Sequence, residues 1–86
     1  MSDQSEPQLQ IIARAPFRVY YEGPAYLLSA TNKVGKFDVL PGHADFFSVL
    51  VPGDIVIETE AGTVQFPITN GIVAVRNDEA MLFVNM

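Results

Sequence analysis

The sequence predicts an all-β domain, a sandwich or a barrel built from short strands. Turn-forming residues recur about every 8–12 residues, as they do between the strands of such folds. No helical period of apolar residues persists over about twelve residues. The 86 residues are 49% hydrophobic and 17% charged, which is enough apolar content for one compact core. We therefore expect a single β domain over residues 9–86.

In the first half of the chain, apolar and polar residues alternate in short runs. Pro16 interrupts the first run because proline cannot donate a hydrogen bond to a neighbouring strand. Gly23 and Pro24 mark the next turn, and residues 31–35 have the composition of a loop. The strands expected here are residues 9–15, 17–22 and 25–31.

Residues 35–53 hold two Pro-Gly pairs, at Pro41-Gly42 and Pro52-Gly53. Proline fixes φ and glycine accepts positive φ, so each pair predicts a turn. Between them lies an aromatic-rich segment in which Asp45 is the only formal charge. We interpret this stretch as the functional loop system of the domain.

The second half predicts two hairpins. Residues 54–60 and 62–68 alternate around a turn at Ala61-Gly62, with Ile55 and Ile57 on one face. Asn70-Gly71 predicts a tight turn, since both residue types tolerate positive φ. Residues 72–76 and 80–84 are apolar at nearly every position, which indicates burial on both faces or a place in the middle of a sheet.

Candidate catalytic residues are few. His43 is the only histidine, and Asp38 and Asp45 flank it, but catalysis or metal binding needs further ligands or a nucleophile. We interpret His43 as a turn residue that hydrogen-bonds the backbone or lies in an interface. Glu58 and Glu60 are interpreted as a solvated strand face. With no cysteine and no phosphate-binding glycine loop, we expect no catalytic residue, metal or cofactor.

Phe46 and Phe47 are adjacent, so in an extended chain their side chains point to opposite sides. One can then fill the core while the other reaches the surface or a partner; burial of both between sheets is the alternative. Aromatic residues with few charges nearby are typical of protein interfaces. These residues favour a binding or structural domain.

Charge and hydropathy exclude several kinds of partner. The formal net charge is −5 and the five basic residues are scattered, which argues against nucleic acid. Residues 1–8 are expected to be a disordered polar lead, unlike a signal peptide. No apolar run approaches the ~20 residues of a membrane-spanning helix, so we expect a cytoplasmic protein without direct membrane insertion.

The segment Val39-Leu40-Pro41-Gly42-His43-Ala44 resembles the Ile-Leu-Pro-Gly-His-Ala motif in the N-terminal domain of the epsilon subunit of F-type ATP synthases. The resemblance runs from about Leu9 to Val84. Leu50, Pro52 and Gly53 match the continuation of this motif. Upstream, the family has Pro, an aliphatic residue, Phe and Gly at the positions of Pro16, Tyr20, Tyr21 and Gly23. Downstream, it has Gly-Gly and an apolar strand at the positions of Asn70-Gly71, Ile72 and Val75.

This resemblance implies a small flattened β-sandwich of about ten short strands. It also implies a non-catalytic rotor subunit that binds the gamma subunit and the c-ring, peripheral to the inner membrane, with no small-molecule substrate. The partner interface is expected at Lys36, Asp38, Pro41, Gly42, His43, Ala44, Phe46 and Phe47.

The sequence departs from the family at the loop expected to face the c-ring. Lys36 stands where an acidic residue is usual, and Asp38 where glycine is common. A partner ring of reversed charge is one interpretation. The family's C-terminal helical hairpin is not expected in this chain, so neither its inhibitory role nor its ATP binding is carried over.

Two other classes of function remain open at this point. One is a stand-alone β-sandwich adaptor that uses the same scaffold to bind another protein. The other is a small β-barrel enzyme or ligand carrier, which would need a pocket lined by His43 with Asp38 or Asp45.

Overall fold

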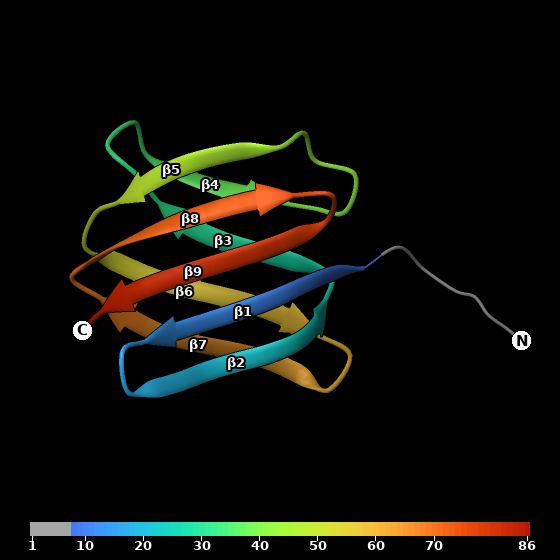
Figure 1. Ribbon diagram of the computed structural model, residues 1–86, viewed down its shortest axis with the longest axis horizontal. Helices are drawn as coiled ribbons and strands as arrows, with labels where there is room; N and C mark the ends of the chain where they lie inside the picture. The colour runs from blue at the N-terminus through green and yellow to red at the C-terminus, as the bar shows by residue number, and fades with distance from the viewer. Residues whose placement is uncertain (1–7) are drawn as a thin grey trace, which may run out of the picture.

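The computed structural model describes residues 8–86, so the predicted polar lead falls outside the described residues except for Gln8. Within this range nine strands are present, where the family resemblance implied about ten (Figure 1). No helix in the described part of the chain is long and apolar enough to cross a bilayer. The strands are β1 Leu9–Ala15, β2 Arg18–Ala25, β3 Leu27–Thr31, β4 Lys36–Val39, β5 Phe46–Leu50, β6 Gly53–Thr59, β7 Gly62–Ile68, β8 Asn70–Arg76 and β9 Glu79–Asn85.

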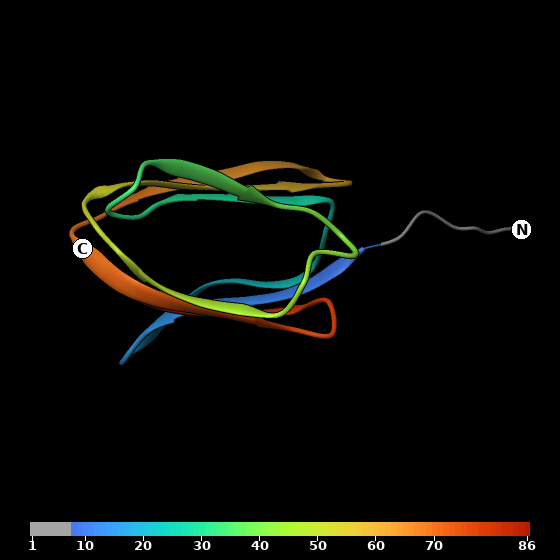
Figure 2. The same ribbon diagram turned by 90° about the horizontal axis from the view of Figure 1, so that it is seen from above.

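The strands form two sheets that pack face to face (Figure 2). A five-stranded sheet has the order β2-β1-β9-β8-β5, and a four-stranded sheet has the order β4-β3-β6-β7. Neighbouring strands are antiparallel except β1 and β9, which are parallel. The predicted β-sandwich is confirmed.

The core lies between the two inner faces. Leu28 and Ile57 from the four-stranded sheet and Val73 and Leu82 from the five-stranded sheet are fully buried. In β8 and β9 every second residue is buried, as expected for strands with one face in the core. The predicted β6–β7 hairpin is confirmed, with Ile55 paired to Phe66 inside the core.

The second strand extends further than the sequence predicts. β2 runs through Gly23 and Pro24 to Ala25, and β3 begins only at Leu27. Pro24 is tolerated because β2 is an edge strand, so its missing amide removes no bond on the open side. The predicted turn at Gly23-Pro24 was therefore wrong.

The tight turn predicted at Asn70-Gly71 was also wrong, because both residues belong to β8. A tight hairpin there would pair β7 with β8, but these strands lie in different sheets. Gly71 is required for close approach instead. A Cβ atom at this position would lie 2.6 Å from the Phe83 carbonyl oxygen of the neighbouring β9.

Strands β8 and β9 lie in the middle of their sheet, as one of the two sequence interpretations held. Burial on both faces was wrong. Ile72, Met81 and Phe83 point away from the core and are 38%, 47% and 45% exposed. The two strands are apolar on both faces because one face packs in the core and the other forms an exposed apolar surface.

Candidate protein-interaction surfaces

The loop between β4 and β5, residues 40–45, is built on the predicted Pro-Gly turn. The His43 amide donates to the Leu40 carbonyl over 3.0 Å, and Gly42 has a φ of +87°. Proline followed by glycine at positive φ, closed by this bond, is the pattern of a type II turn. The turn leaves Gly42, His43 and Ala44 exposed.

His43 contacts its own loop. Its Nδ1 lies 2.7 Å from the Ala44 carbonyl oxygen, within hydrogen-bonding distance, and its ring centroid lies 4.9 Å from that of Phe46. Asp38 and Asp45 bond elsewhere, to Ser29 and to the Asn77 amide. Across residues 8–86, no three acidic or histidine side chains gather in a way that could hold a metal ion. These contacts fit the interpretation of His43 as a turn residue.

Two carboxylates connect this loop to the β8–β9 turn. Asp78 Oδ1 accepts a hydrogen bond of 2.8 Å from the Gly42 amide. In the opposite direction, Asp45 Oδ1 accepts one of 3.0 Å from the Asn77 amide. The loop is therefore bonded at two points, Gly42 and Asp45, to a tight hairpin of the five-stranded sheet.

Lys36 and Asp38 lie on β4, at the edge of the four-stranded sheet. Both are exposed, and their two-residue spacing puts them on the same face. Asp38 accepts a hydrogen bond of 2.8 Å from the buried Ser29 hydroxyl on β3. Lys36 and Asp38 thus form a polar site on the outer side of this edge.

Phe46 and Phe47 point to opposite sides of β5, as one sequence interpretation held. Phe46 packs against the core and makes an edge-to-face contact with Phe37 of β4, with ring centroids 5.7 Å apart. This contact links the edge strands of the two sheets. Phe47 is 63% exposed and points outward.

The outer side of the five-stranded sheet is apolar over four strands. Cross-strand pairing aligns Ile12, Met81, Ala74 and Phe47 in one row across the sheet. The next row runs from Arg14 through Phe83, Ile72 and Val49. We call this surface the outer apolar face; its members are Ile12, Phe47, Val49, Ile72, Ala74, Met81 and Phe83.

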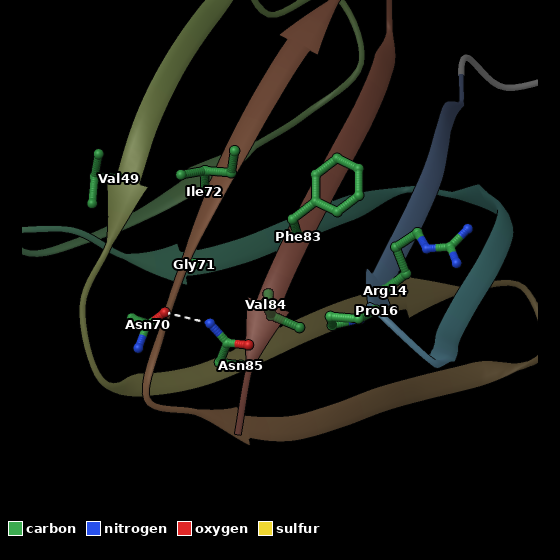
Figure 3. Close-up of a pocket in the computed structure, with 9 residues that line it drawn as sticks. All are labelled: Arg14, Pro16, Val49, Asn70, Gly71, Ile72, Phe83, Val84 and Asn85. Carbon is green, nitrogen blue, oxygen red and sulfur yellow. Dashed lines mark hydrogen bonds between the residues drawn. The ribbon is translucent and has the colours of Figure 1, made fainter.

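A hollow on this face is lined by Ile72 and Phe83, among the residues drawn in Figure 3. Gly71 supplies no side chain there, and Arg14 brings a positive charge to the rim. At one end Asn85 donates a hydrogen bond of 2.8 Å to the Asn70 side chain. The hollow offers apolar contact area with polar groups at its border, which is how protein interfaces are composed.

The comparison with protein families identifies the family of this chain. The family model described as "ATP synthase, Delta/Epsilon chain, beta-sandwich domain" matches residues 8–86. This chain belongs to that family.

Individual relatives agree with this membership. The ATP synthase epsilon chain of Clostridium perfringens strain 13 is 30% identical over 79 residues, which cover 91% of this chain and 59% of the relative. The epsilon chain of Synechococcus elongatus is 28% identical over 71 residues, which cover 83% of this chain and 52% of the relative. The chain therefore spans less than two thirds of the length of these relatives.

Solved structures share the fold. A chain of the Euglena gracilis mitochondrial ATP synthase, in a structure of OSCP, F1 and c-ring, superposes with a TM-score of 0.84 at 21% identity, covering 99% of this chain and 56% of that one. A chain from the central stalk and c-ring of the Tetrahymena thermophila mitochondrial ATP synthase superposes with a TM-score of 0.79 at 16% identity, covering 96% of this chain and 67% of that one.

In this delta/epsilon β-sandwich the predicted interface residues do not form one surface. Lys36 and Asp38 lie on the outer side of the four-stranded sheet, and Phe47 lies on the outer apolar face of the other sheet. Residues 41–44 occupy the loop at one end of β4, and Phe46 packs inward. Sequence reasoning missed most of the outer apolar face. The available signal was the apolar character of β8 and β9 at positions that alternate with the core residues.

Proposed function

We propose that this chain is the β-sandwich part of a non-catalytic rotor subunit of an F-type ATP synthase, bound to the gamma subunit and to the c-ring. The observation that carries the proposal is the outer apolar face in a member of the delta/epsilon family. The two similar structures are ATP synthase assemblies that include a c-ring, and that of Tetrahymena thermophila is a central stalk with its c-ring.

We assign the outer apolar face to the gamma subunit. Phe47 and Val49 are more than 60% exposed, and Ile72, Met81 and Phe83 extend the same surface over neighbouring strands. A contiguous apolar patch on a folded chain is typical of a protein-binding site. Because the patch spreads in two rows over four strands, it fits an extended partner surface better than a small ligand.

The c-ring contact is assigned to the edge formed by β4, β5 and their adjoining loops, which lies at the top of Figure 1. This edge presents Lys33, Lys36, Asp38 and His43, all exposed. Polar and charged side chains at a rim steer association and set its salt dependence more than they add affinity. Lys33 and Lys36 favour a ring whose loops carry acidic groups.

A rotor subunit of this kind transmits force between the gamma subunit and the c-ring, so it must stay rigid and bound to both. Nine strands in two sheets, joined at one edge by the Phe37–Phe46 contact, suit transmission of force between two partners. No step of chemistry is assigned to any residue. Held to the ring, the subunit would lie at the cytoplasmic surface of the inner membrane without entering it.

The test is a pull-down of the tagged chain with the gamma subunit and the detergent-solubilised c-ring of the same organism, at low and moderate salt. We expect gamma to be retained at both salt concentrations, because apolar contacts are weakly screened, and the ring to be retained mainly at low salt. A well-folded sample that captures neither partner would contradict the rotor function and favour the stand-alone adaptor.

A further inference from the structure

We propose that Asp45 and Asp78 are positioning residues that fix the His43 loop relative to the outer apolar face. They would thereby hold the ring-facing edge and the gamma-facing sheet as one rigid unit. This inference deepens the proposed function and depends on it. It rests on the two hydrogen bonds that cross between the loop and the β8–β9 turn.

The turn is a rigid anchor. Asn77 and Asp78 have φ values of 52° and 62°, as the two central residues of a type I′ hairpin require. The Asp78 carbonyl also accepts a hydrogen bond of 2.8 Å from the Gln10 amide on β1. Asp78 is thus fixed through its backbone to β1, while its side chain reaches the loop.

The loop has little other support at this point. A Cβ atom at Gly42 would meet nothing within 4 Å, so no side chain packs against the turn from that direction. Inside the loop, the turn bond and the His43–Phe46 contact set the local shape but not its placement on the sandwich. The position of the loop on the sandwich is set by β4 and β5 at its ends and by the carboxylates of Asp45 and Asp78.

The geometry connects the two proposed partner surfaces. Strands β8 and β9 carry Ile72, Ala74, Met81 and Phe83 of the outer apolar face, and the Asn77-Asp78 turn joins these two strands. The hydrogen bond that the Gly42 amide donates to Asp78 therefore connects the loop that would touch the ring with the strands that would hold gamma.

The experiment compares Asp78→Gly and Asp45→Ala with Asp78→Asn and Asp45→Asn. An asparagine side-chain oxygen can still accept the amide hydrogen, whereas glycine and alanine remove the acceptor. Glycine is used at position 78 because Asp78 has a φ of 62°, which glycine and asparagine tolerate and alanine does not. Hydrogen exchange at the Gly42 and Asn77 amides, measured by NMR, reports each bond directly. We expect about fivefold faster exchange in the matching glycine or alanine variant, the effect of losing one exposed hydrogen bond, and partial or full rescue in the asparagine variant.

Binding to the c-ring and to gamma is measured on the same samples. We expect Asp78→Gly to weaken ring binding several-fold while gamma binding stays unchanged, and Asp78→Asn to keep ring binding close to that of the unmodified chain. His43→Ala combined with Asp78→Gly should weaken ring binding less than the sum of the two changes, because both act through one loop.

The outcomes separate the two claims. If His43→Ala weakens ring binding but Asp78→Gly and Asp45→Ala do not, the positioning role is overturned and the proposed function stands. Equal loss of gamma and ring binding in Asp78→Gly, together with a lower melting temperature, would also overturn the positioning role, since it indicates a general structural defect. If the unmodified chain does not bind the ring, the ring contact of the proposed function fails.

Discussion

The Asp78 carboxylate lies 2.8 Å from the Gly42 amide, although the two residues are 36 positions apart in the chain. Gly42 belongs to the loop between the edge strands β4 and β5, and Asp78 to the turn between the central strands β8 and β9. The bond therefore joins the edge of the sandwich to the middle of the five-stranded sheet. It explains how an exposed loop with few packing contacts can keep a defined orientation.

Replacing Gly42 by alanine should destabilise the protein through the backbone alone. With φ at +87° and nothing within 4 Å of the position that a Cβ atom would take, an alanine side chain has space but an unfavourable conformation. We expect a loss of about 1–2 kcal/mol in the free energy of unfolding, measured by urea denaturation. Gly42→Asn should lose less, because asparagine tolerates positive φ. Equal losses in the two variants would contradict this account.

Gly71→Ala should destabilise for a different reason. A Cβ atom at Gly71 would lie 2.6 Å from the Phe83 carbonyl and 3.1 Å from Val84 Cγ1, so β8 and β9 would have to separate locally. We expect a loss of about 1–3 kcal/mol, as for other overpacked sites. Gly71→Asn should be at least as damaging as Gly71→Ala, in contrast to position 42. A smaller loss of stability in Gly71→Asn than in Gly71→Ala would instead support the tight turn that the sequence predicted at this position.

These two glycines show how far sequence reasoning reaches. Pro41-Gly42 could be predicted as a turn because the conformational preferences of both residues are local. Asn70-Gly71 has an equally strong local preference, but its conformation is decided by a neighbouring strand and by the crossing from one sheet to the other. Long-range pairing of this kind leaves no mark within a few residues of the glycine.

The candidate surfaces divide in the same way. The alternation of β6 and β7 made their buried residues predictable. Strand geometry predicted that Phe46 and Phe47 point to opposite sides, but not which of the two faces the core. The outer apolar face could not be assembled, because its rows depend on the order in which β1, β9, β8 and β5 lie side by side. The parallel pairing of the first and last strands brings Arg14 beside Phe83, from opposite ends of the chain.

The outer apolar face should tolerate polar residues in the isolated chain. Ile72→Gln with Phe83→Gln removes two central apolar side chains that are 38% and 45% exposed. We expect little change in melting temperature and a tenfold or greater loss of gamma binding, since truncated interface anchors cost about 2 kcal/mol or more. Thr63→Gln, on the exposed side of the other sheet, is the matched control. Unchanged gamma binding in the double variant would place the gamma contact elsewhere.

Lys36→Glu should change the salt dependence of ring binding. Lys36 is exposed at the start of the edge strand β4, and its charge would face acidic groups on the ring. We expect several-fold weaker binding at low salt and convergence with the unmodified chain at high salt, because exposed charges are screened. Arg18→Glu, on the far edge strand β2, makes the same change in net charge. Tighter binding by Lys36→Glu would indicate a basic ring surface instead.

His43→Ala should separate a role in binding from a role in folding. The side chain is exposed and makes one contact with the Ala44 carbonyl and one with the Phe46 ring. Removing it should change the free energy of unfolding by less than about 1 kcal/mol, as at other surface positions. Phe46→Ala, which removes a ring packed against the core, should cost clearly more. If His43 is the polar contact at the ring, binding falls while the melting temperature stays within a few degrees. A stability loss matching that of Phe46→Ala would instead make His43 a structural residue of the loop.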